Sequence, residues 1–312
     1  MSIGVIFPGQ GSQSVGMLAA LAEEFTEVRS CFDEASSLLG YDLWALVQNG
    51  PDEKLNQTAI TQPALLTAGV AAWRVWRSEN GPAARVMAGH SLGEYTALVC
   101  AEAMAFDDAV RIVARRGELM QEAVAVGEGA MAAILGLDDA QVAAACAEAA
   151  DGQVVEPVNF NSPGQVVIAG HRAAVERAIA AAQARRAKKG MILPVSVPSH
   201  CALMEPAAGH LASELDKIEI RAPKVPVIHN VDARPRTDPQ AIRTALVQQL
   251  HRPVRWVDVI RAMTADGLAL VIEPGPGKVL SGLGKRIERD ANFLPVFDPE
   301  SLAKALNAAL EM

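Results

Sequence analysis

A Gly-x-Ser-x-Gly turn at Gly89–Gly93 constrains the fold of this chain more than any other stretch. The apolar run Val86–Ala88 precedes it and the run Tyr95–Cys100 follows it, which predicts a strand, a tight turn and a helix. Glycines without a Cβ let the helix pack close to the strand and leave Ser91 exposed at the apex. Unpaired N–H groups at the helix start would stabilise an oxyanion formed on Ser91. The stretch indicates a nucleophile elbow for acyl transfer, and a plain turn with an unused serine stays an alternative.

An N-terminal loop offers a second set of accessible N–H groups. Ile3–Phe7 predicts a buried strand, Pro8–Gly11 closes it, and we expect a helix over Ser14–Phe25. The glycines of this loop would let the main chain pass close to a ligand, so the N–H of Gln10 is a candidate oxyanion donor beside that of Leu92. A simple turn between a strand and a helix explains the same glycines equally well.

Arg116 has an unusual position on the helix predicted between residues 106 and 123. The other charged residues of this helix make a solvated face, whereas Arg116 falls with Ile112 and Leu119 on the apolar stripe. A buried guanidinium is unfavourable unless it meets a carboxylate or an equivalent acceptor. A structural salt bridge, or a side chain that extends to water, accounts for this position. A bidentate clamp for a substrate carboxylate is the alternative.

Alternating strands and helices predict an α/β fold with an insert. Residues 1–125 and 198–312 predict a catalytic domain with a mostly parallel sheet, in which one strand is expected over Lys224–Asn230. Residues 126–197 follow the order βαββαβ, which is typical of a ferredoxin-like subdomain. Its strands are expected at 130–137, 153–160, 165–170 and 191–197, and its helices at 138–150 and 173–187.

His200 is the leading candidate for a general base among the six histidines. Pro198 should end the last strand of the insert, and the next helix is expected to begin near Cys201. The helix dipole there would disfavour the imidazolium and keep the ring able to accept a proton. We would look for an orienting carboxylate at Asp258 or Glu273, and a purely structural role for the histidine stays open.

Composition excludes several classes of protein. A formal net charge of −8 argues against binding to nucleic acid, whose phosphates would be repelled. The four cysteines show no C-x-x-C spacing, which argues against zinc and disulfides, and no window of about twenty residues is apolar enough to span a membrane. We expect a cytoplasmic, monomeric protein with no bound metal or other cofactor.

Seven short motifs follow one another along the chain. They are Phe7–Gln13, Thr61–Ala64, Gly89–Glu94, Arg116–Gly117, Asn159–Asn161, Val197–His200 and Glu273–Lys278. In sequence and order they resemble the malonyl-CoA:acyl carrier protein transacylases of bacterial fatty acid synthesis, and the resemblance runs nearly from end to end. It implies a hydrolase-like α/β core with a ferredoxin-like insert, and an active site in the cleft between them.

The resemblance also implies roles for particular residues. Ser91 would be the acylated nucleophile and His200 the general base. The N–H groups of Gln10 and Leu92 would form the oxyanion hole. The main-chain carbonyl of Gln249 would orient His200 in place of a carboxylate.

The same resemblance implies the substrates and the residues that bind them. The acyl donor would be malonyl-CoA and the acceptor a holo acyl carrier protein, with Arg116 as the clamp for the malonate carboxylate. The other substrate-binding residues would be Gln62, His90, Asn159 and Asn161. Carrier proteins of this kind are strongly acidic, so docking needs a local basic surface on this acidic chain. The basic clusters 185–189 and 285–289 are the candidates.

Three other functions remain open at this point. A serine esterase or thioesterase would use the same elbow without needing a buried Arg116. A malonyl transferase of a malonate decarboxylase system would share the whole site. A non-catalytic carrier-binding module would be expected to lack Ser91 or His200, and both are present.

Overall fold

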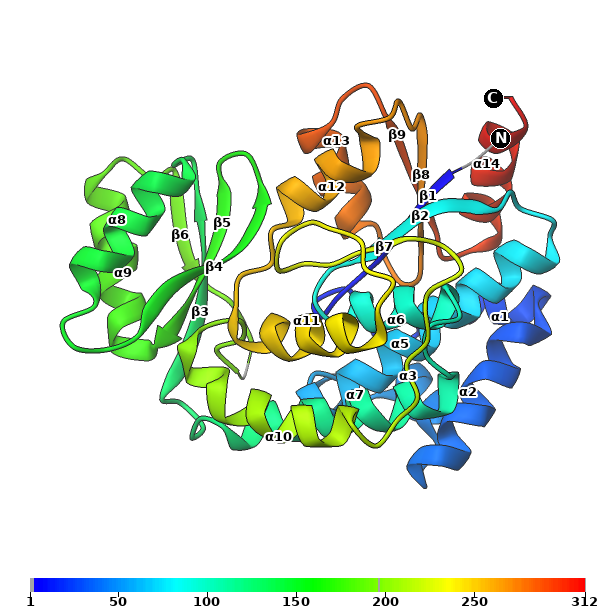
Figure 1. The fold of residues 1–312 in the computed structure, drawn as a ribbon, viewed down its shortest axis with the longest axis horizontal. Helices are drawn as coiled ribbons and strands as arrows, with labels where there is room; N and C mark the ends of the chain where they lie inside the picture. Colours follow the sequence, from blue (N-terminus) through cyan, green and yellow to red (C-terminus); the bar gives the residue numbers. More distant parts are fainter. Residues whose placement is uncertain (1–2, 196, 312) are drawn as a thin grey trace.

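The larger part of the molecule is built on a parallel sheet with the strand order β7-β2-β1-β8-β9 (Figure 1). The computed structural model describes residues 3–195 and 197–311. The strands are β1 (Ile3–Phe7), β2 (Ala84–Gly89), β7 (Val227–Ile228), β8 (Leu270–Pro274) and β9 (Asn292–Val296). Every neighbouring pair is parallel, as the alternation of strands and helices predicts.

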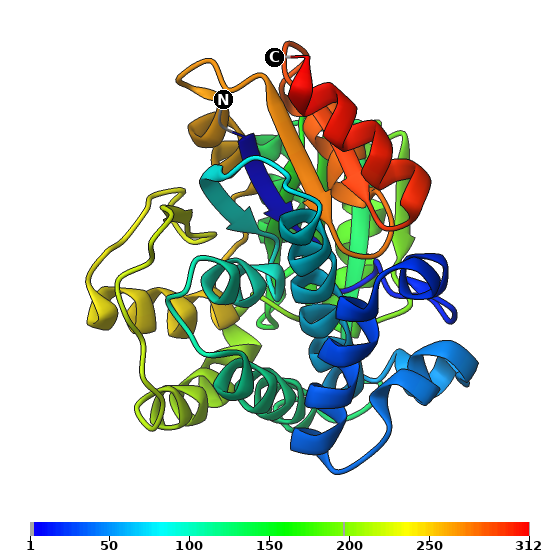
Figure 2. The same ribbon diagram turned by 90° about the vertical axis from the view of Figure 1, so that its right-hand side faces the viewer.

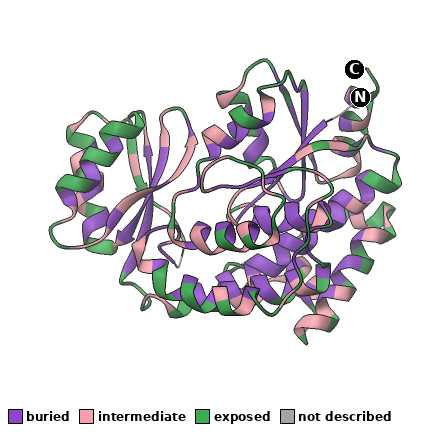
Figure 3. Ribbon diagram, viewed as in Figure 1, coloured by how far each residue is buried: buried purple, intermediate pink, exposed green. Residues whose placement is uncertain are grey.

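Helices cover both faces of this sheet. Successive side chains of each strand point to opposite faces, so each strand contributes residues to two cores. In β1, Val5 and Phe7 belong to the large hydrophobic core, whereas Ile6 belongs to the core on the other face. The large core packs against α2 (Thr26–Leu39), α5 (Thr58–Ser78), α6 (Gly93–Cys100), α7 (Phe106–Glu122) and α14 (Pro299–Leu310) (Figures 2 and 3). The second core packs against α12 (Trp256–Thr264) and α13 (Val279–Ile287).

The remaining helices of the larger part surround this core. They are α1 (Ala19–Glu24), α3 (Leu43–Asn49), α4 (Asp52–Leu55), α10 (Glu205–Leu215) and α11 (Pro239–His251), with a 3₁₀ turn over Ala202–Met204. None of the helices in the described part of the chain is long and apolar enough to cross a membrane.

The smaller part is a four-stranded antiparallel sheet covered by two helices, on the left of Figure 1. Its elements are β3 (Gly129–Leu135), α8 (Asp139–Ala149), β4 (Val155–Ser162), β5 (Gln165–His171), α9 (Arg172–Ala184) and β6 (Lys189–Ile192). The strand order β4-β5-β3-β6 is that of a ferredoxin-like fold, which confirms the predicted βαββαβ unit. Its helices and sheet enclose a hydrophobic core of their own.

Three predicted elements are shorter than expected. The helix expected over Ser14–Phe25 begins only at Ala19, because Gly16 and Leu18 have left-handed backbone with φ of 82° and 60°. The strand expected at 191–197 is β6, which ends at Ile192, and Ser196 lies outside the described residues. The strand expected over Lys224–Asn230 is the two-residue edge strand β7, which follows a proline that has no N–H for the ladder.

Candidate active site

The turn between β2 and α6 has the geometry of a nucleophile elbow. Ser91 has a φ of 51°, which places a non-glycine residue in the left-handed region at the apex. A Cβ on Gly89 would lie 1.9 Å from the carbonyl carbon of Gly93, and a Cβ on Gly93 would lie 2.1 Å from the main-chain oxygen of Phe7. Close approach of the backbone therefore requires both glycines, and the helix begins directly behind the serine.

Ser91 and His200 are joined by a hydrogen bond. The Oγ of Ser91 lies 2.8 Å from Nε2 of His200, and Nδ1 of His200 lies 2.6 Å from the main-chain oxygen of Gln249. A carbonyl oxygen can only accept, so Nδ1 carries the proton and donates it to Gln249. Nε2 of the neutral ring then has a free lone pair facing the Ser91 hydroxyl, which is the arrangement a general base needs.

Burial is the main reason that His200 stays neutral. It lowers the pKa of His200 to about 3, and the Arg116 charge acts in the same direction, while the hydrogen bond to Gln249 opposes both. The helix dipole that the sequence suggested is not the leading cause. The 3₁₀ turn begins at Ala202 and α10 only at Glu205.

The expectation of a carboxylate beside His200 is wrong for both candidates. Glu273 is fully buried, but its oxygens accept hydrogen bonds from the N–H groups of Leu280 (2.9 Å) and Ser281 (2.6 Å) at the start of α13. Burial raises the pKa of Glu273 to about 7, against the effect of these hydrogen bonds. Asp258 accepts a hydrogen bond from Arg255 at 2.8 Å on the surface. Both acids are occupied elsewhere, Glu273 by N–H groups at the start of α13 and Asp258 by the neighbouring Arg255.

Two N–H groups beside Ser91 are free to bind an oxyanion. Those of Gln10 and Leu92 have no acceptor within the part of the chain that the structure describes, and both residues line the cavity at Ser91. The N–H of Ser91 itself is occupied, because it donates to Oδ1 of Asn230 at 2.7 Å. The N-terminal loop packs tightly on the elbow, since a Cβ on Gly9 would lie 2.4 Å from a main-chain oxygen of the elbow.

Arg116 is buried next to Ser91 without an ion pair. Its Nη1 donates to Oε1 of Gln62 at 2.8 Å and its Nη2 to Oε1 of Gln249 at 3.0 Å, and the guanidinium lies 5.5 Å from the ring centre of Tyr95. No carboxylate of the described residues lies within 4.0 Å of it. Burial lowers the pKa of Arg116, because the charge is removed from water. The structural salt bridge considered from the sequence is therefore absent from the described structure.

Most of the predicted site residues line one cavity of about 90 Å³ between the two parts of the molecule. Its lining comprises Gln10, His90, Ser91, Leu92, Arg116, Met120, Met131, Asn159, Val195, Ser199 and His200. Gln62 and Gln249 lie behind Arg116, and Nε2 of His90 lies 2.8 Å from Oδ1 of Asn161. Burial lowers the pKa of His90, which favours the neutral ring.

Asn159 is notable because its Oδ1 is buried without a hydrogen-bond partner among the described residues. A buried carbonyl oxygen without a donor is unfavourable. Since Asn159 also lines the cavity, this oxygen is a ready acceptor for an N–H group of a ligand.

Two buried residues beneath the elbow were not identified from the sequence, namely Glu94 and Asn230. Both are fully buried, and Asn230 accepts the N–H of Ser91 while its Nδ2 donates to the main-chain oxygen of Gly89 at 2.7 Å. A detectable signal existed for Glu94, which is a lone carboxylate in the otherwise uncharged sequence of α6. No comparable signal marks Asn230, because only tertiary contact brings it to the elbow.

Comparisons with known proteins agree with this geometry. Residues 5–292 match the model of the acyl transferase domain family. The malonyl CoA-acyl carrier protein transacylase of Escherichia coli strain K12 is 60% identical over 301 residues, which cover 96% of this chain and 97% of that protein.

Solved structures give the same answer. An acyl carrier protein S-malonyltransferase from Vibrio cholerae has a TM-score of 0.95 at 56% identity and covers 97% of this chain and 99% of its own. A malonyl-transacylase solved in complex with its type II polyketide synthase acyl-carrier protein has a TM-score of 0.97 at 55% identity, covering 99% and 100%. The chain belongs to the acyl transferase family, among the malonyl CoA-acyl carrier protein transacylases.

Proposed function

We propose that this chain transfers a malonyl group from malonyl-CoA to the phosphopantetheine thiol of a holo acyl carrier protein, through a malonyl ester on Ser91. The observation that carries the proposal is the Ser91–His200 hydrogen bond of 2.8 Å in a cavity that also holds an arginine without an ion pair. The activities in the names of the related proteins support it.

In the first half-reaction, Nε2 of His200 takes the hydroxyl proton of Ser91 as Oγ bonds to the thioester carbon. The resulting oxyanion is stabilised by the N–H groups of Gln10 and Leu92. When the C–S bond breaks, the imidazolium returns the proton to the departing CoA sulfur. The product is malonyl-Ser91 and free CoA.

In the second half-reaction, the carrier thiol gives its proton to His200 and its sulfur attacks the ester carbon. The same two N–H groups stabilise the second oxyanion, and Ser91 leaves with the proton from His200. Water must be kept from the ester between these steps. The small cavity between the two parts of the molecule supports this requirement.

Arg116 binds the free carboxylate of the malonyl group in this proposal. Its present partners are the side-chain oxygens of Gln62 and Gln249 and, at 3.4 Å, the Oγ of Ser91, which hold the guanidinium plane without neutralising its charge. A planar guanidinium suits bidentate binding of a carboxylate. His90, Asn159 and Asn161 complete the substrate contacts, and Asn159 offers an unpaired Oδ1.

The proposed docking surface for the acidic carrier protein combines the two basic clusters. Lys188 and Arg286 line the same groove of about 440 Å³ between the subdomain and α13, and Nη1 of Arg286 donates to Oε1 of Gln165 at 2.9 Å across it. Opposite charges at this groove would offset the general repulsion expected from a chain of net charge −8. We further propose a monomer in the cytoplasm, and the free thiols of the four cysteines support a reducing compartment.

Intact-mass spectrometry tests the proposal directly. Mixing the protein with malonyl-CoA should add one malonyl mass to Ser91, and holo carrier protein should then remove it as malonyl carrier protein. S91A should take up none. Rapid loss of the ester to water without a carrier would favour the thioesterase reading instead, and label on another residue in S91A would contradict the nucleophile assignment.

A further inference from the structure

A buried carboxylate lies directly beneath the nucleophile. Glu94, in the first turn of α6, is fully buried. Its Oε1 accepts from Nδ1 of His229 at 2.7 Å, and its Oε2 accepts from the N–H of Asn230 at 2.9 Å and from Nε2 of Gln249 at 3.0 Å. Both oxygens of Glu94 accept hydrogen bonds, as expected for an ionised carboxylate that is buried among donors.

His229 does not cancel this negative charge. Its Nε2 is buried and has no hydrogen-bond partner among the described residues. An imidazolium would bury an unpaired N–H at that atom, whereas a neutral ring protonated on Nδ1 satisfies the contact with Glu94. The Glu94–His229 pair therefore carries one net negative charge.

Glu94 reaches the reacting groups through Gln249. Because Nε2 of Gln249 donates to Glu94 at 3.0 Å and to the main-chain oxygen of Ser91 at 2.9 Å, its Oε1 is turned towards Nη2 of Arg116. The main-chain oxygen of the same residue accepts from Nδ1 of His200 at 2.6 Å. Gln249 thus joins the buried anion to Arg116 and to His200, which becomes positively charged only during the reaction.

Neither Arg116 nor His200 is in direct contact with a negatively charged group among the described residues. Arg116 has no carboxylate within 4.0 Å among the described residues, and the Glu94 charge opposes the lowering of the pKa of Arg116 by burial. His200 also becomes an imidazolium during each half-reaction, yet it faces a neutral carbonyl where many serine enzymes have an aspartate.

We propose that Glu94 is a positioning residue that supplies the negative charge of the site, acting on Arg116 and His200 through Gln249. The intervening amide keeps the anion out of the guanidinium fork. A carboxylate in direct contact with Arg116 would occupy the donors that the malonyl carboxylate requires. The inference rests on the proposed acyl transfer and adds to it the source of the counter-charge.

The variant E94Q removes the charge and keeps the shape. Its side-chain oxygen can still accept from Asn230 and Gln249, and its NH₂ can donate to Nδ1 of His229 once the proton of that ring moves to Nε2. We expect the rate of Ser91 acylation by malonyl-CoA to fall about 10- to 100-fold, because the imidazolium that forms on His200 then has no buried negative charge to balance it. The inhibition constant of free malonate should stay the same or fall, because Arg116 has lost a competing anion.

E273Q is the matched control, since Glu273 is an equally buried carboxylate that contacts neither Ser91 nor Arg116. At pH 8, above the pKa of about 7 of Glu273, both variants lose a charge, and E273Q should acylate within about twofold of the parent. An unchanged acylation rate in E94Q, an equal loss in E273Q, or malonate binding that weakens in parallel with the rate would each overturn the inference. If the parent itself takes up no malonyl group, the proposed function fails rather than this inference.

If E94Q folds poorly, melting temperatures still test whether the charges of Glu94 and Arg116 are coupled. Loss of Glu94 alone leaves Arg116 buried without its counter-charge, whereas E94Q/R116M removes both charges together. The double variant is expected to melt above E94Q. Melting temperatures that fall additively would show that the two charges are not coupled, and would also overturn the inference.

Discussion

The side chain of Arg116 is buried, yet its positive charge is not neutralised by an ion pair among the described residues and can bind a ligand. It is only 1% exposed, yet its hydrogen-bond acceptors are all neutral: the side-chain oxygens of Gln62 and Gln249 and, at 3.4 Å, the Oγ of Ser91. A guanidinium held in this way keeps its donors in a fixed plane and its charge available to a ligand. Selectivity for a substrate with a free carboxylate should therefore depend on this residue.

The variant R116A tests this selectivity. Loss of a buried, charge-assisted contact should remove roughly 2–5 kcal/mol of preference for malonyl over acetyl groups. Acylation rates with malonyl-CoA and acetyl-CoA, measured by quenched flow, should converge or reverse in R116A. An equal loss with both substrates would point to a structural role.

His200 links the site to stability at low pH. Its pKa of about 3 in the folded protein lies below the value of 6.5 that is usual for histidine. Between these two pH values the unfolded chain binds a proton at His200 and the folded protein does not. The free energy of unfolding therefore decreases as pH falls from 6.5 towards 3.

The variant H200Q should lack this pH dependence. Between pH 6.5 and pH 4, the parent should lose about 1.4 kcal/mol more per pH unit than H200Q in free energy of unfolding. Urea unfolding at several pH values measures the difference, and the other titrating groups cancel in it. Parallel pH profiles for the two proteins would mean that His200 is not held neutral by the fold.

Helix α6 connects the elbow to the rest of the sheet. Its N-terminal residue Gly93 packs so closely on β1 that a Cβ there would lie 2.1 Å from the main-chain oxygen of Phe7. The position of Ser91 relative to the N-terminal loop depends on this contact, because β1 leads directly into that loop.

The variant G93A should therefore damage both stability and activity. A clash with rigid backbone should cost about 1–3 kcal/mol in free energy of unfolding and displace the elbow from Gln10, so acylation should fall with it. The control is G209A in α10, where a Cβ meets nothing within 4 Å and should stabilise the helix by about 0.5–1 kcal/mol. Full acylation by G93A would show that the elbow tolerates a wider gap to β1.

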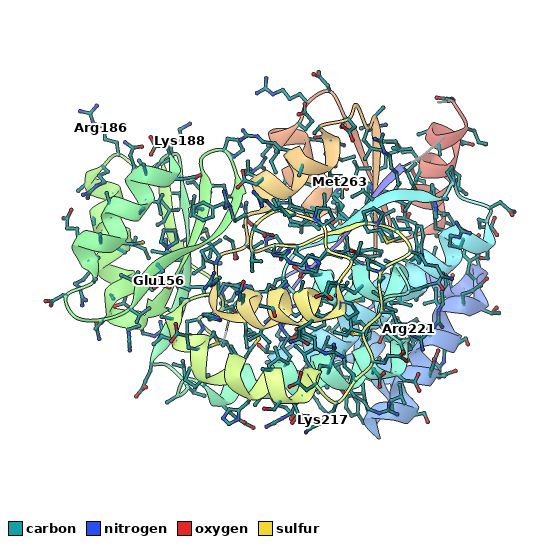
Figure 4. All side chains as sticks on the ribbon, viewed as in Figure 1. Glu156, Arg186, Lys188, Lys217, Arg221 and Met263 are labelled. Carbon is teal, nitrogen blue, oxygen red and sulfur yellow. The ribbon has the colours of Figure 1, made fainter. Side chains whose placement is uncertain are left out.

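The two parts of the molecule bring together basic residues that are far apart in the sequence. Lys188 of the subdomain and Arg286 of α13 line one groove, and neither has an ion-pair partner among the described residues. In Figure 4, Lys188 lies at the upper end of the subdomain, whereas Lys217 and Arg221 lie in the lower part of the view and pair with local glutamates.

Charge reversal tests the groove as the docking surface. K188E/R286E should raise the KM for the carrier protein and flatten its dependence on ionic strength, because steering of an acidic partner is lost. Acylation by malonyl-CoA should change little, since it needs no docking. The control K217E/R221E should leave carrier kinetics unchanged. Identical salt profiles for the groove variant and the parent would rule out this surface.

The sequence by itself determined the local elements that carry the chemistry. The Gly-x-Ser-x-Gly pattern predicted the strand, turn and helix around Ser91, and the alternation of elements predicted the parallel sheet with its βαββαβ insert, because backbone geometry and hydrophobic periodicity are local properties. The apolar stripe of α7 likewise placed Arg116 on the face that packs against the core, where the structure buries it.

Only the tertiary structure decided which groups surround these residues. Local patterns suggested Asp258 or Glu273 as the partner of His200, yet its Nδ1 donates to the main-chain oxygen of Gln249. Every residue has a main-chain oxygen, so the type of residue at a position does not indicate this role. Glu94 stands out in the sequence as a lone carboxylate, but its place beneath the site is shown only by its contacts with Gln249 and Asn230 from distant segments. Such contacts join residues more than a hundred positions apart, and their partners depend on how the helices pack rather than on any periodic pattern.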